Sequence, residues 1–421
     1  MKRTKLKLAV NKDGTMSLTN EMLTTVSVER KTCRACNEPT LVPILDLGNQ
    51  YLVNFVPSPD PDLPRSPLEL QRCSSCGLLQ LKHTVDPELL YREFWYRSSV
   101  NQTMRDALKN LVLDGLKYHQ NGRWLDIGAN DGYLMGEVPG QFTRISCEPA
   151  LNFTDDLRRV SDEVIPDFFS ASHQIIKDCI RLGGIDVITS AAMFYDLDEP
   201  DVFVADIAKS LSKNGVWINQ LNDAPTMLDA NAFDAICHEH LCYYDVHSLK
   251  KLYERNGLTI VEITRNDING GSIRVVAKKY DGINGENLMM HRVVTEKQAR
   301  DFAGRVEKWK ERMLDLVRGP LVERGPLWCY GASTKGCCLL QYLDAPGAFR
   351  AIADRNPAKF GTYMTGSWLP VTHEQEMRDE KPPYALVLPW TFASEFNKRE
   401  REMMDNGTCL VYPLPNIQVV M

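Results

Sequence analysis

Short apolar runs separated by segments of helical length make up most of the chain. Between residues 83 and 280 we expect buried strands at RWLDIG, TRISCEPA, DVITSA and GVWINQ, with helices such as DVFVADIAKSLSKNG between them. Strands that alternate with helices in this way form βαβ units and a parallel sheet. From residue 321 to 421 the alternation starts again, at PLWCYGASTKG, FRAIADRN and YALVLPW. The pattern therefore predicts two α/β domains, the second smaller than the first.

One long helix is predicted between these domains, over residues 296–318. Its apolar positions are spaced four, three, four and three residues apart, at Phe302, Val306, Trp309, Met313 and Leu316. This spacing puts them on one helix face among many charges. We therefore assign residues 281–320 to a helical connector.

The first 82 residues follow a different pattern. Residues 31–82 contain the run VPSPDPDLPRSP, which is too broken by proline for a helix. The segment is also too short to build its own core. In residues 1–30 the turn signal NKDG and the alternating stretch SLTNEMLTTVSVER indicate a short hairpin in an N-terminal extension.

Composition narrows the class of protein. The chain has 421 residues, of which 43% are hydrophobic and 25% charged, with a net charge of -6. These values exclude a largely disordered chain and disfavour binding to nucleic acid. No apolar run is long enough to span a membrane, and the apolar stretch after MKRTKLKLAV ends too soon for a signal peptide. We therefore expect a cytoplasmic protein without a membrane or nucleic-acid partner; the sequence does not indicate its oligomeric state.

Four of the twelve cysteines form two pairs with CxxC spacing. Each such turn directs two thiolates to one point, so two turns complete a tetrahedral site with four sulfur ligands, here Cys33, Cys36, Cys73 and Cys76. Four protein ligands leave no position for water, which indicates one structural zinc per chain. The alternatives are two pairs of free thiols or a redox role, although neither pair opens a helix of a thioredoxin-like unit.

A glycine-rich loop follows the first strand of the larger domain. The string Trp124-Leu-Asp126-Ile-Gly128-Ala-Asn130-Asp131-Gly132 differs from the G-x-G-x-x-G of dinucleotide sites and matches the loop of class I S-adenosylmethionine-dependent methyltransferases. Other strand ends follow in order, and the whole expected cofactor set is Asp126, Gly128, Asn130, Gly132, Glu148, Asp167, Phe168 and Ala191. The acidic side chain of Glu148 can accept both ribose hydroxyls. A Rossmann oxidoreductase is the alternative.

The string Cys237-His238-Glu239-His240 places three titratable side chains after the strand GVWINQ. Ligand sites of α/β sheets open at this edge. Histidine is well suited to proton transfer near neutral pH, and an adjacent glutamate can raise its basicity. Two alternatives are a metal site formed by His238, His240 and His247, and polar side chains that satisfy one another in a loop.

The smaller domain also contains a loop suited to an anion. Tyr330-Gly-Ala-Ser333-Thr-Lys335-Gly follows a strand and opens a helix, where hydroxyls, a lysine and a helix N-terminus favour phosphate. Its spacing is not that of a Walker loop. Asp354, Asn356 and Lys359 follow the next strand and are candidates for a second nucleotide contact. Taken alone, this domain could also be an interaction module.

The order of these motifs resembles the zinc-containing sugar C-methyltransferases, which methylate C3 of nucleotide-linked 4-keto deoxysugars. The resemblance covers about residues 31–421: CxxC…CxxC, the D-x-G-x-x-x-G loop, the E-H pair in FDAICHEH, NGGSIR and YGASTKG. It implies a class I methyltransferase sheet preceded by a zinc-binding domain and followed by a Rossmann-like domain. It also implies S-adenosylmethionine as methyl donor and a nucleotide-linked sugar as substrate.

The resemblance assigns roles to individual residues. His240 matches the family's base, with Glu239 beside it, and Tyr96 matches a tyrosine near the sugar. The expected substrate-binding residues are Ser98, Ser99, His238, Ser333, Lys335, Asp354, Asn356 and Lys359. Cys237 and Arg97 depart from the tyrosine and histidine of some members and bear on which sugar is accepted. Competing hypotheses are an RNA or other small-molecule methyltransferase and a catalytically silent sugar-nucleotide binding protein.

Overall fold

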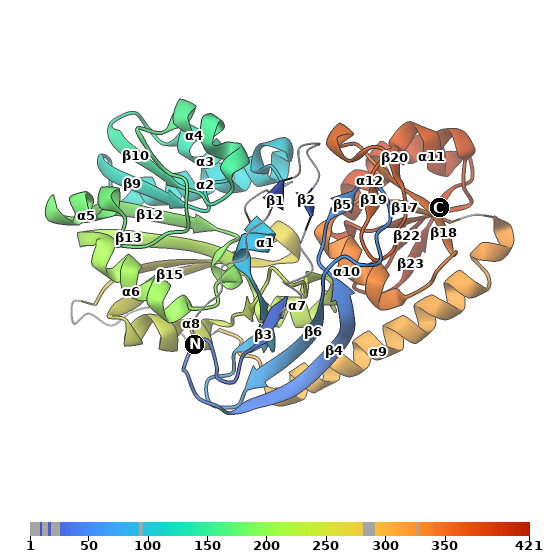
Figure 1. Cartoon of the computed structure of the whole chain (residues 1–421), viewed down its shortest axis with the longest axis horizontal. Coiled ribbons are helices and arrows are strands. Elements are labelled where there is room, and N and C mark those ends of the chain that lie inside the picture. The colour runs from blue at the N-terminus through green and yellow to red at the C-terminus, as the bar shows by residue number, and fades with distance from the viewer. Residues whose placement is uncertain (1–8, 11–15, 18–25, 92–95, 281–290, 326) are drawn as a thin grey trace.

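The computed structural model describes residues 9–10, 16–17, 26–91, 96–280, 291–325 and 327–421. Two α/β bodies lie at opposite ends of the molecule, and strands from the first 85 residues lie between them (Figure 1). We call residues 27–85 the N-terminal module. None of the described helices is long and apolar enough to cross a membrane.

A seven-stranded sheet forms the larger body, in the order β11-β10-β9-β12-β13-β16-β15. Its strands are β9 (Gly122–Ile127), β10 (Phe142–Cys147), β11 (Glu163–Ile165), β12 (Ile185–Ala191), β13 (Leu211–Asn222), β15 (Leu258–Asn266) and β16 (Ser272–Lys279). Strands β9 to β13 pair in parallel, whereas β16 runs antiparallel to both of its neighbours, β13 and β15. This is the doubly wound class I methyltransferase sheet that the sequence predicts.

Helices cover both faces of this sheet. One face packs against α2 (Gln102–Tyr118) and α3 (Tyr133–Glu137), whose buried side chains meet Trp124, Val187 and Val216. On the other face lie α5 (Gln174–Arg181), α6 (Pro200–Ser210) and α8 (Val246–Arg255). Because the parallel strands end at one edge, the segments after β9, β10 and β12 meet there.

The N-terminal module, for which the sequence predicts no regular element, is an antiparallel sheet. Its order is β14-β7-β6-β4, formed by β4 (Leu41–Tyr51), β6 (Arg65–Cys73), β7 (Leu79–Leu81) and β14 (Cys242–Tyr243). Strand β14 comes from the larger body and closes the edge of this sheet. The run VPSPDPDLP lies mostly between strands, where its missing amide hydrogens cost no ladder hydrogen bond.

Short pairings tie the module to its surroundings. Strand β3 (Ser27–Glu29) pairs with β8 (His83–Val85), and β5 (Phe55–Val56) pairs with β19 (Tyr363–Met364) of the C-terminal body. In the N-terminal extension, β1 (Ala9–Val10) pairs antiparallel with β2 (Met16–Ser17). The turn of the hairpin predicted there lies outside the described residues.

The C-terminal body is a second, smaller α/β unit, as the sequence predicts. Its sheet has the order β20-β18-β17-β21-β22-β23, with only β23 (Gln418–Val420) antiparallel. The parallel strands are β17 (Leu327–Tyr330), β18 (Phe349–Asp354), β20 (Val371–His373), β21 (Tyr384–Val387) and β22 (Cys409–Tyr412). Its helices are α10 (Thr334–Leu343), α11 (Glu374–Glu380), α12 (Ala393–Arg399) and α13 (Arg401–Asp405).

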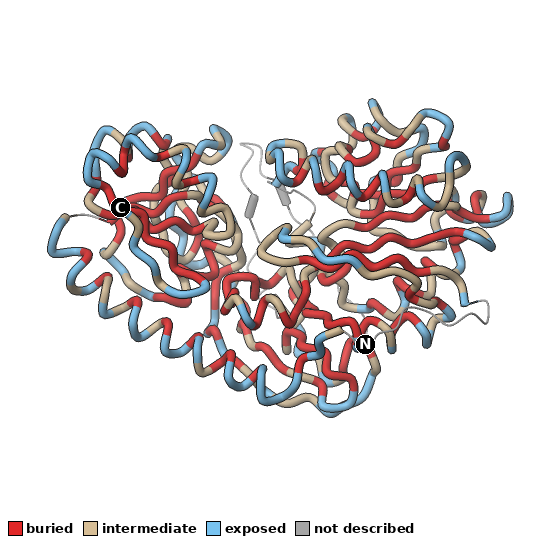
Figure 2. The backbone as a smooth tube through the Cα atoms, turned by 180° about the vertical axis from the view of Figure 1, so that it is seen from behind, coloured by how far each residue is buried: buried red, intermediate tan, exposed pale blue. Residues whose placement is uncertain are grey.

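The predicted connector helix is α9, Glu296–Arg318. It begins at a capping box in which Thr295 and Gln298 satisfy each other's backbone amides. One face is buried along its whole length, from Phe302 to Val317, and the opposite face is exposed (Figure 2). The predicted stripe is confirmed, with Leu316 half-buried and Val317 completing it.

Two helical glycines give a test of how packing competes with helix propensity. A methyl group on Gly115 of α2 would overlap the buried ring of Trp124, whereas one on Gly304 of α9 would meet nothing within 4 Å. Alanine gains about 0.5–1 kcal/mol over glycine in a helix, but overpacking a core costs about 1–3 kcal/mol. We expect Gly304→Ala to raise the free energy of unfolding and Gly115→Ala to lower it. Chemical denaturation checks both variants, and stabilisation by Gly115→Ala would contradict the packing around Trp124.

Candidate active site and zinc-binding site

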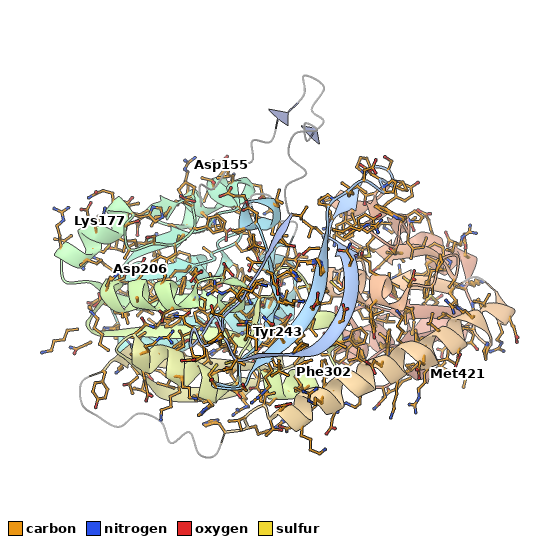
Figure 3. The ribbon with its side chains drawn as sticks, turned by 60° about the horizontal axis from the view of Figure 1, so that its bottom comes forward. Asp155, Lys177, Asp206, Tyr243, Phe302 and Met421 are labelled. Carbon is orange, nitrogen blue, oxygen red and sulfur yellow. The ribbon has the colours of Figure 1, made fainter. Side chains whose placement is uncertain are left out.

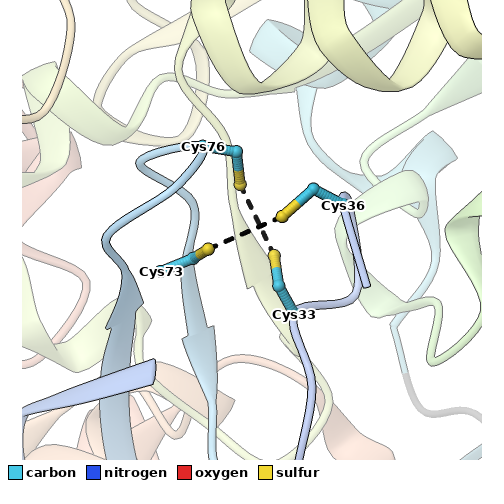
Figure 4. Close-up of side chains that lie close together, drawn as sticks. All are labelled: Cys33, Cys36, Cys73 and Cys76. Atoms are coloured by element: carbon cyan, nitrogen blue, oxygen red, sulfur yellow. Dashed lines mark hydrogen bonds between the residues drawn. The ribbon is translucent and has the colours of Figure 1, made fainter. Parts of the chain in front are cut away.

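The side chains of the four cysteines predicted as zinc ligands point toward one another and bring their sulfur atoms together (Figure 4). Their sulfur atoms all lie within 4.8 Å of one another, with 3.5 Å between Cys33 and Cys76 and 3.6 Å between Cys36 and Cys73. These distances are too long for disulfides, in which the sulfurs are about 2.05 Å apart.

The cluster fits a zinc ion. Tetrahedral coordination with Zn–S bonds of about 2.3 Å separates the sulfurs by about 3.8 Å, close to the distances observed. Backbone turns support the arrangement: the Cys33 amide donates to the Glu38 carbonyl and the Cys73 amide to the Leu78 carbonyl, each at 2.9 Å. An ion here would have a structural role, because the four thiolates leave no coordination position for a substrate.

A cavity of about 270 Å³ opens at the carboxyl ends of β9, β10 and β12. Its lining includes ten of the residues predicted from the sequence: Tyr96, Ser98, Asp126, Gly128, Asn130, Glu148, Phe168, Ala191, His238 and Glu239. The remaining predicted residues do not line it: Ser99, Gly132, Asp167, His240, Ser333, Lys335, Asp354, Asn356 and Lys359. Cofactor-loop residues and the His-Glu pair therefore share one cavity, and the C-terminal candidates lie elsewhere.

The glycine-rich loop lies flat against the end of β10. Gly128 has a φ of +71°, and a Cβ on it would approach Met193 Cγ to 2.9 Å. Its amide donates to the Cys147 carbonyl at 2.9 Å. A side chain at this position would therefore be strained and would displace Met193. The loop needs glycine here to keep the cavity open.

Burial shifts the carboxyl groups of the cofactor site toward their protonated forms. Desolvation raises the pKa of Asp126 to about 7, although Thr189 donates a hydrogen bond to it at 2.7 Å. Burial also raises the pKa of Glu148, against hydrogen bonds from the amides of Asn130 and Ala150, each at 2.8 Å. Each Glu148 oxygen has one lone pair left to accept a hydroxyl. The geometry therefore suits the predicted ribose contact.

The segment that carries Tyr96 is hydrogen-bonded to the same loop. The Asn130 side chain accepts from the Ser98 amide at 2.9 Å and donates to the Tyr96 carbonyl at 3.0 Å. Asp131 accepts from the hydroxyls of Ser98 at 2.7 Å and Ser99 at 2.6 Å. Both serine hydroxyls are thus engaged in holding this segment. Tyr96 is 47% exposed; partial desolvation of its hydroxyl and the nearby Asp131 carboxylate raise its pKa to about 12, so the hydroxyl remains a proton donor.

Polar atoms of the adjacent cavity wall are left without partners. Among the described residues, Asp196 Oδ1, His238 Nδ1 and Glu239 Oε2 are buried and make no hydrogen bond. Burial raises the pKa of Asp196 well above its usual range, and the nearby Glu239 raises it further. The pKa of Glu239 is also raised by burial. Unpaired buried groups cost free energy unless a ligand satisfies them, which marks this wall as a binding surface.

His238 presents a defined tautomer to the cavity. Its Nε2 lies 2.9 Å from the Ser66 carbonyl, which can only accept, so Nε2 carries the hydrogen and Nδ1 has the lone pair. The side chain is only 2% exposed, and this burial lowers its pKa to about 4. The ring is therefore neutral at physiological pH.

His240 is absent from the cavity lining and has the opposite tautomer. Its Nδ1 is 2.8 Å from the Ala235 carbonyl, so the lone pair of the neutral ring is on Nε2. Tyr195 packs edge-on against the ring, with 4.6 Å between centroids. Burial lowers the pKa of His240 to about 4, and the charge of Lys335 lowers it further. Lys335, from the start of α10, is thus a neighbour of His240.

The remaining C-terminal candidates hold one another in place. Asp354 accepts from the amides of Ala332 and Asn356, each at 2.7 Å, and Lys359 donates to the Ala332 carbonyl at 2.6 Å. Ser333 caps α10 by accepting from the Gly336 amide at 3.0 Å. The structure brings these residues to the ends of β17 and β18, at a distance from the cavity lining.

Contacts between the two α/β bodies surround Lys335. Its ammonium donates to the Asn269 carbonyl at 3.2 Å, and the Trp390 indole donates to buried Asp234 at 2.8 Å. Asn269 belongs to the NGGSIR motif and Asp234 to the FDAICHEH string, so both motifs lie at this interface.

Several lining residues were not predicted from the sequence. Thr84, Tyr91, Asp196, Asp198 and Phe203 all line the cavity. Asp196 could have been found from the sequence, because it follows closely after the strand end at residues 190–194. No sequence motif marked Thr84, which lies at the end of the N-terminal module in the short strand β8.

The cysteine cluster predicts one zinc per chain. Cys73→Ser removes one thiolate, and because metal binding contributes to the folding free energy, we expect zinc loss and a lower melting temperature. Elemental analysis and thermal denaturation measure these effects. Cys409→Ser, a buried cysteine outside the cluster, is the control and should retain its zinc. A metal-free wild-type protein with the same stability as the zinc-loaded protein would contradict the prediction.

Burial of neutral His238 predicts a pH-dependent stability. Because the unfolded histidine titrates near pH 6.5 and the folded one near 4, the unfolded state binds more protons between these values, and wild type loses stability as the pH falls through them. His238→Asn removes that loss and keeps an N–H for Ser66. Relative to wild type, its free energy of unfolding should rise by about 2–3 kcal/mol from pH 7.5 to 4.5. Denaturant titrations at both pH values measure the difference, and a pH-independent difference would contradict the prediction.

Family models match three successive parts of the chain. They are "Putative zinc binding domain" over residues 33–91, "Methyltransferase domain" over residues 96–263 and "C-methyltransferase C-terminal domain" over residues 267–415. The first contains the cysteine cluster, the second the cofactor loop and cavity, and the third the C-terminal body.

Individual proteins are similar to this chain along most of its length or along part of it. The C-methyltransferase NovU of Streptomyces niveus is 26% identical over 408 residues, which cover 92% of this chain and 96% of that protein. The N-methyltransferase NodS from Bradyrhizobium japonicum WM9 aligns with a TM-score of 0.34 and 15% identity, over 44% of this chain and 99% of that one. An S-adenosylmethionine-dependent methyltransferase from Clostridium acetobutylicum ATCC 824 aligns with a TM-score of 0.34 and 10% identity, over 42% and 92%. From its family-model matches and its cavity, the chain is an S-adenosylmethionine-dependent C-methyltransferase with a zinc-binding domain at its N-terminus.

Proposed function

We propose that this enzyme methylates the carbon next to the ketone of a nucleotide-linked 4-keto sugar. The supporting observation is that Tyr96, His238 and Glu239 line one cavity with the cofactor-loop residues Gly128 and Asn130. A carbon acid held there would have proton-transfer groups and the methyl donor within one enclosed space. The similarity to a C-methyltransferase along 92% of the chain agrees with this proposal.

The reaction requires a base, a hydrogen-bond donor to the enolate oxygen, and alignment of the carbon with the methyl group. A carbon next to a ketone is acidic because its anion delocalises onto oxygen as an enolate. Bound S-adenosylmethionine would supply an electrophilic methyl group, held by Asp126, Gly128 and Glu148. The chain itself must remove the proton, stabilise the oxyanion and hold the carbon in line.

His240 is the base in this proposal. Its proton on Nδ1 is held by the Ala235 carbonyl, which leaves the lone pair on Nε2. His240 does not itself line the cavity, so the sugar would have to extend beyond the lining residues for Nε2 to accept its C3 proton. Tyr195 fixes the plane of the ring. Neutral imidazole is the reactive form, and burial keeps the ring in that form. Glu239, one residue away, is assigned the role of tuning this base.

Tyr96 is the donor to the enolate oxygen. Its high pKa keeps the hydroxyl protonated, and Asn130 and Asp131 hold its segment against the cofactor loop. The diphosphate and nucleotide are assigned to the loop of Ser333 and Lys335 with Asp354, Asn356 and Lys359. A substrate that reaches from this loop to the cavity would pass His240, since Lys335 is its neighbour.

Other acceptors would give different behaviour. An RNA substrate would need a basic surface and would give salt-dependent binding, whereas the chain has a net charge of -6. Another small ketone would be methylated without the nucleotide. Competition by free nucleoside diphosphates would therefore favour the sugar nucleotide over both alternatives.

The test follows the C3 proton separately from methyl transfer. The enzyme is incubated in D2O, without S-adenosylmethionine, with a set of nucleotide-linked 4-keto deoxysugars. The members of the set differ in the nucleoside diphosphate that they carry. Wild type should exchange deuterium into C3, and His240→Asn should lower the exchange rate by roughly a hundredfold or more. The matched control is His247→Asn, which changes an exposed histidine of α8 and should exchange like wild type.

The pH profile gives a second readout. Because burial lowers the pKa of His240 to about 4, the base is already neutral at pH 6, so kcat/KM should stay level from pH 7.5 to about 5.5 and fall below that. Near wild-type exchange and methylation by His240→Asn would show that His240 is not the base, and His238 would then be the next residue to test.

A further inference from the structure

The second pair of zinc ligands belongs to a hairpin that holds the cavity wall. Strand β6 ends at Cys73, and β7 begins three residues after Cys76. Fixing the two sulfurs therefore fixes how these strands enter and leave the turn. The Gly77 amide donates to the Cys73 carbonyl at 2.9 Å, which closes the turn through the backbone.

Both strands of this hairpin contact the His238–Tyr243 segment. On β6, the Ser66 carbonyl lies 2.9 Å from His238 Nε2. On β7, the Leu81 amide donates to the Leu241 carbonyl at 2.9 Å. Two residues later β14 pairs with β7, with Tyr243 opposite Leu79; Figure 3 labels Tyr243 at the centre of the molecule. The segment carrying the candidate base is therefore held from both strands.

The first pair of ligands reaches the cavity through Arg34, which lies between Cys33 and Cys36. Its side chain is fully buried, and its guanidinium makes three hydrogen bonds. Nε donates to Asp198 Oδ1 at 3.1 Å, Nη1 to the Leu81 carbonyl at 2.5 Å and Nη2 to Thr84 Oγ1 at 2.7 Å. Thr84 also donates to Asp198 at 2.7 Å.

The partners of Arg34 are parts of the cavity wall. Thr84 and Asp198 line the cavity, and Leu81 is bonded to Leu241, which lines it too. A fully buried guanidinium is held firmly only when its donors are satisfied, and here they meet residues of the wall. The conformation of the CxxC turn sets where Arg34 enters this network.

We infer that Arg34 is a positioning residue that couples closure of the cysteine cluster to the shape of the active-site wall. Through Arg34 the first turn places Thr84 and Asp198, and through its hairpin the second turn places His238–Tyr243. The N-terminal module thus shapes the site in addition to being folded by its metal. The coupling does not depend on which acceptor is methylated.

Arg34→Lys is the main test. It keeps the positive charge but removes the planar guanidinium, whose three nitrogens donate to three different partners. The full-length, zinc-loaded protein is examined by hydrogen exchange with mass spectrometry. Peptides covering residues 194–199 and 237–243 should exchange at least about tenfold faster than in wild type, while β17 and β18 are unchanged. Zinc content should remain that of wild type, and affinity for S-adenosylhomocysteine should stay within about twofold, since Asp126 and Glu148 do not contact Arg34.

Two further variants separate coupling from a general loss of stability. Thr84→Val keeps the size of the side chain, removes the two hydrogen bonds that the Thr84 hydroxyl makes with Arg34 and Asp198, and should reproduce part of the effect. Arg72→Lys is the matched control, because Arg72 precedes Cys73 but donates to the Val294 carbonyl, at 2.9 Å, outside the cavity lining. It should leave both peptides unchanged.

Removal of zinc from wild type by a chelator should accelerate exchange in the same two peptides, and added zinc should restore it. In Arg34→Lys, added zinc should not restore it. Unchanged exchange in Arg34→Lys, or faster exchange throughout the molecule including the C-terminal sheet, would overturn the inference.

A kinetic measurement of methyl transfer adds a further test, and this test rests on the proposed function. With the 4-keto sugar as acceptor, Arg34→Lys should lower kcat by roughly tenfold and leave the KM for S-adenosylmethionine within twofold. An equal kcat per folded molecule would contradict the positioning role. Wild-type protein inactive on every sugar nucleotide would count against the proposed substrate only, because the exchange and zinc measurements are made without it.

Discussion

The pairing of β14 with β7 is the constraint on which the arrangement of this enzyme depends. It joins Cys242 and Tyr243 of the methyltransferase body to the edge of the N-terminal sheet. An edge strand left unpaired would expose a row of hydrogen-bonding groups, so the module and the methyltransferase body complete each other. The large buried core continues through the module and both α/β bodies. Removing the module would therefore open the core as well as the active-site wall.

Burial shifts the pKa values of the titratable groups at the candidate site so that their uncharged forms are favoured. It raises the pKa values of Asp126, Glu148 and Glu239 and lowers those of His238 and His240. In each case the uncharged form is favoured. Desolvation outweighs the hydrogen bonds that Thr189 and the backbone amides supply, because those bonds remove only part of the cost of burying a charge. In the proposed reaction, such an environment would strengthen the attraction between a cationic methyl donor and a developing enolate.

Local sequence signals predicted the parts of the site that lie on one stretch of chain. The glycine loop at Gly128, the strand end at Glu148 and the helix α9 all follow from spacing and periodicity, because each depends on neighbours within a few residues. Thr84 and Arg34 could not be placed in the same way. Their roles depend on β7 pairing with β14, a contact between segments about 160 residues apart, and no local pattern encodes such a pairing. The strands β4 and β6 were missed for a related reason, since their prolines mask the alternation of the residues around them.

Arg97 and Cys237 differ from the residues found in some members of the family that the sequence resembles, and the structure places both side chains away from the cavity lining. Arg97 follows Tyr96 directly, yet its guanidinium pairs with Asp156 at 2.9 Å and is absent from the cavity lining. Cys237 is fully buried and does not line the cavity either. Neither side chain is placed to contact an acceptor bound in this cavity. Arg97 and Cys237 could affect the choice of acceptor only indirectly, by changing the position of the backbone beside the cavity. Tyr96, Asp196 and Asp198 line the cavity themselves. Selectivity within the cavity is therefore assigned to the wall that Arg34 and the N-terminal module hold in place.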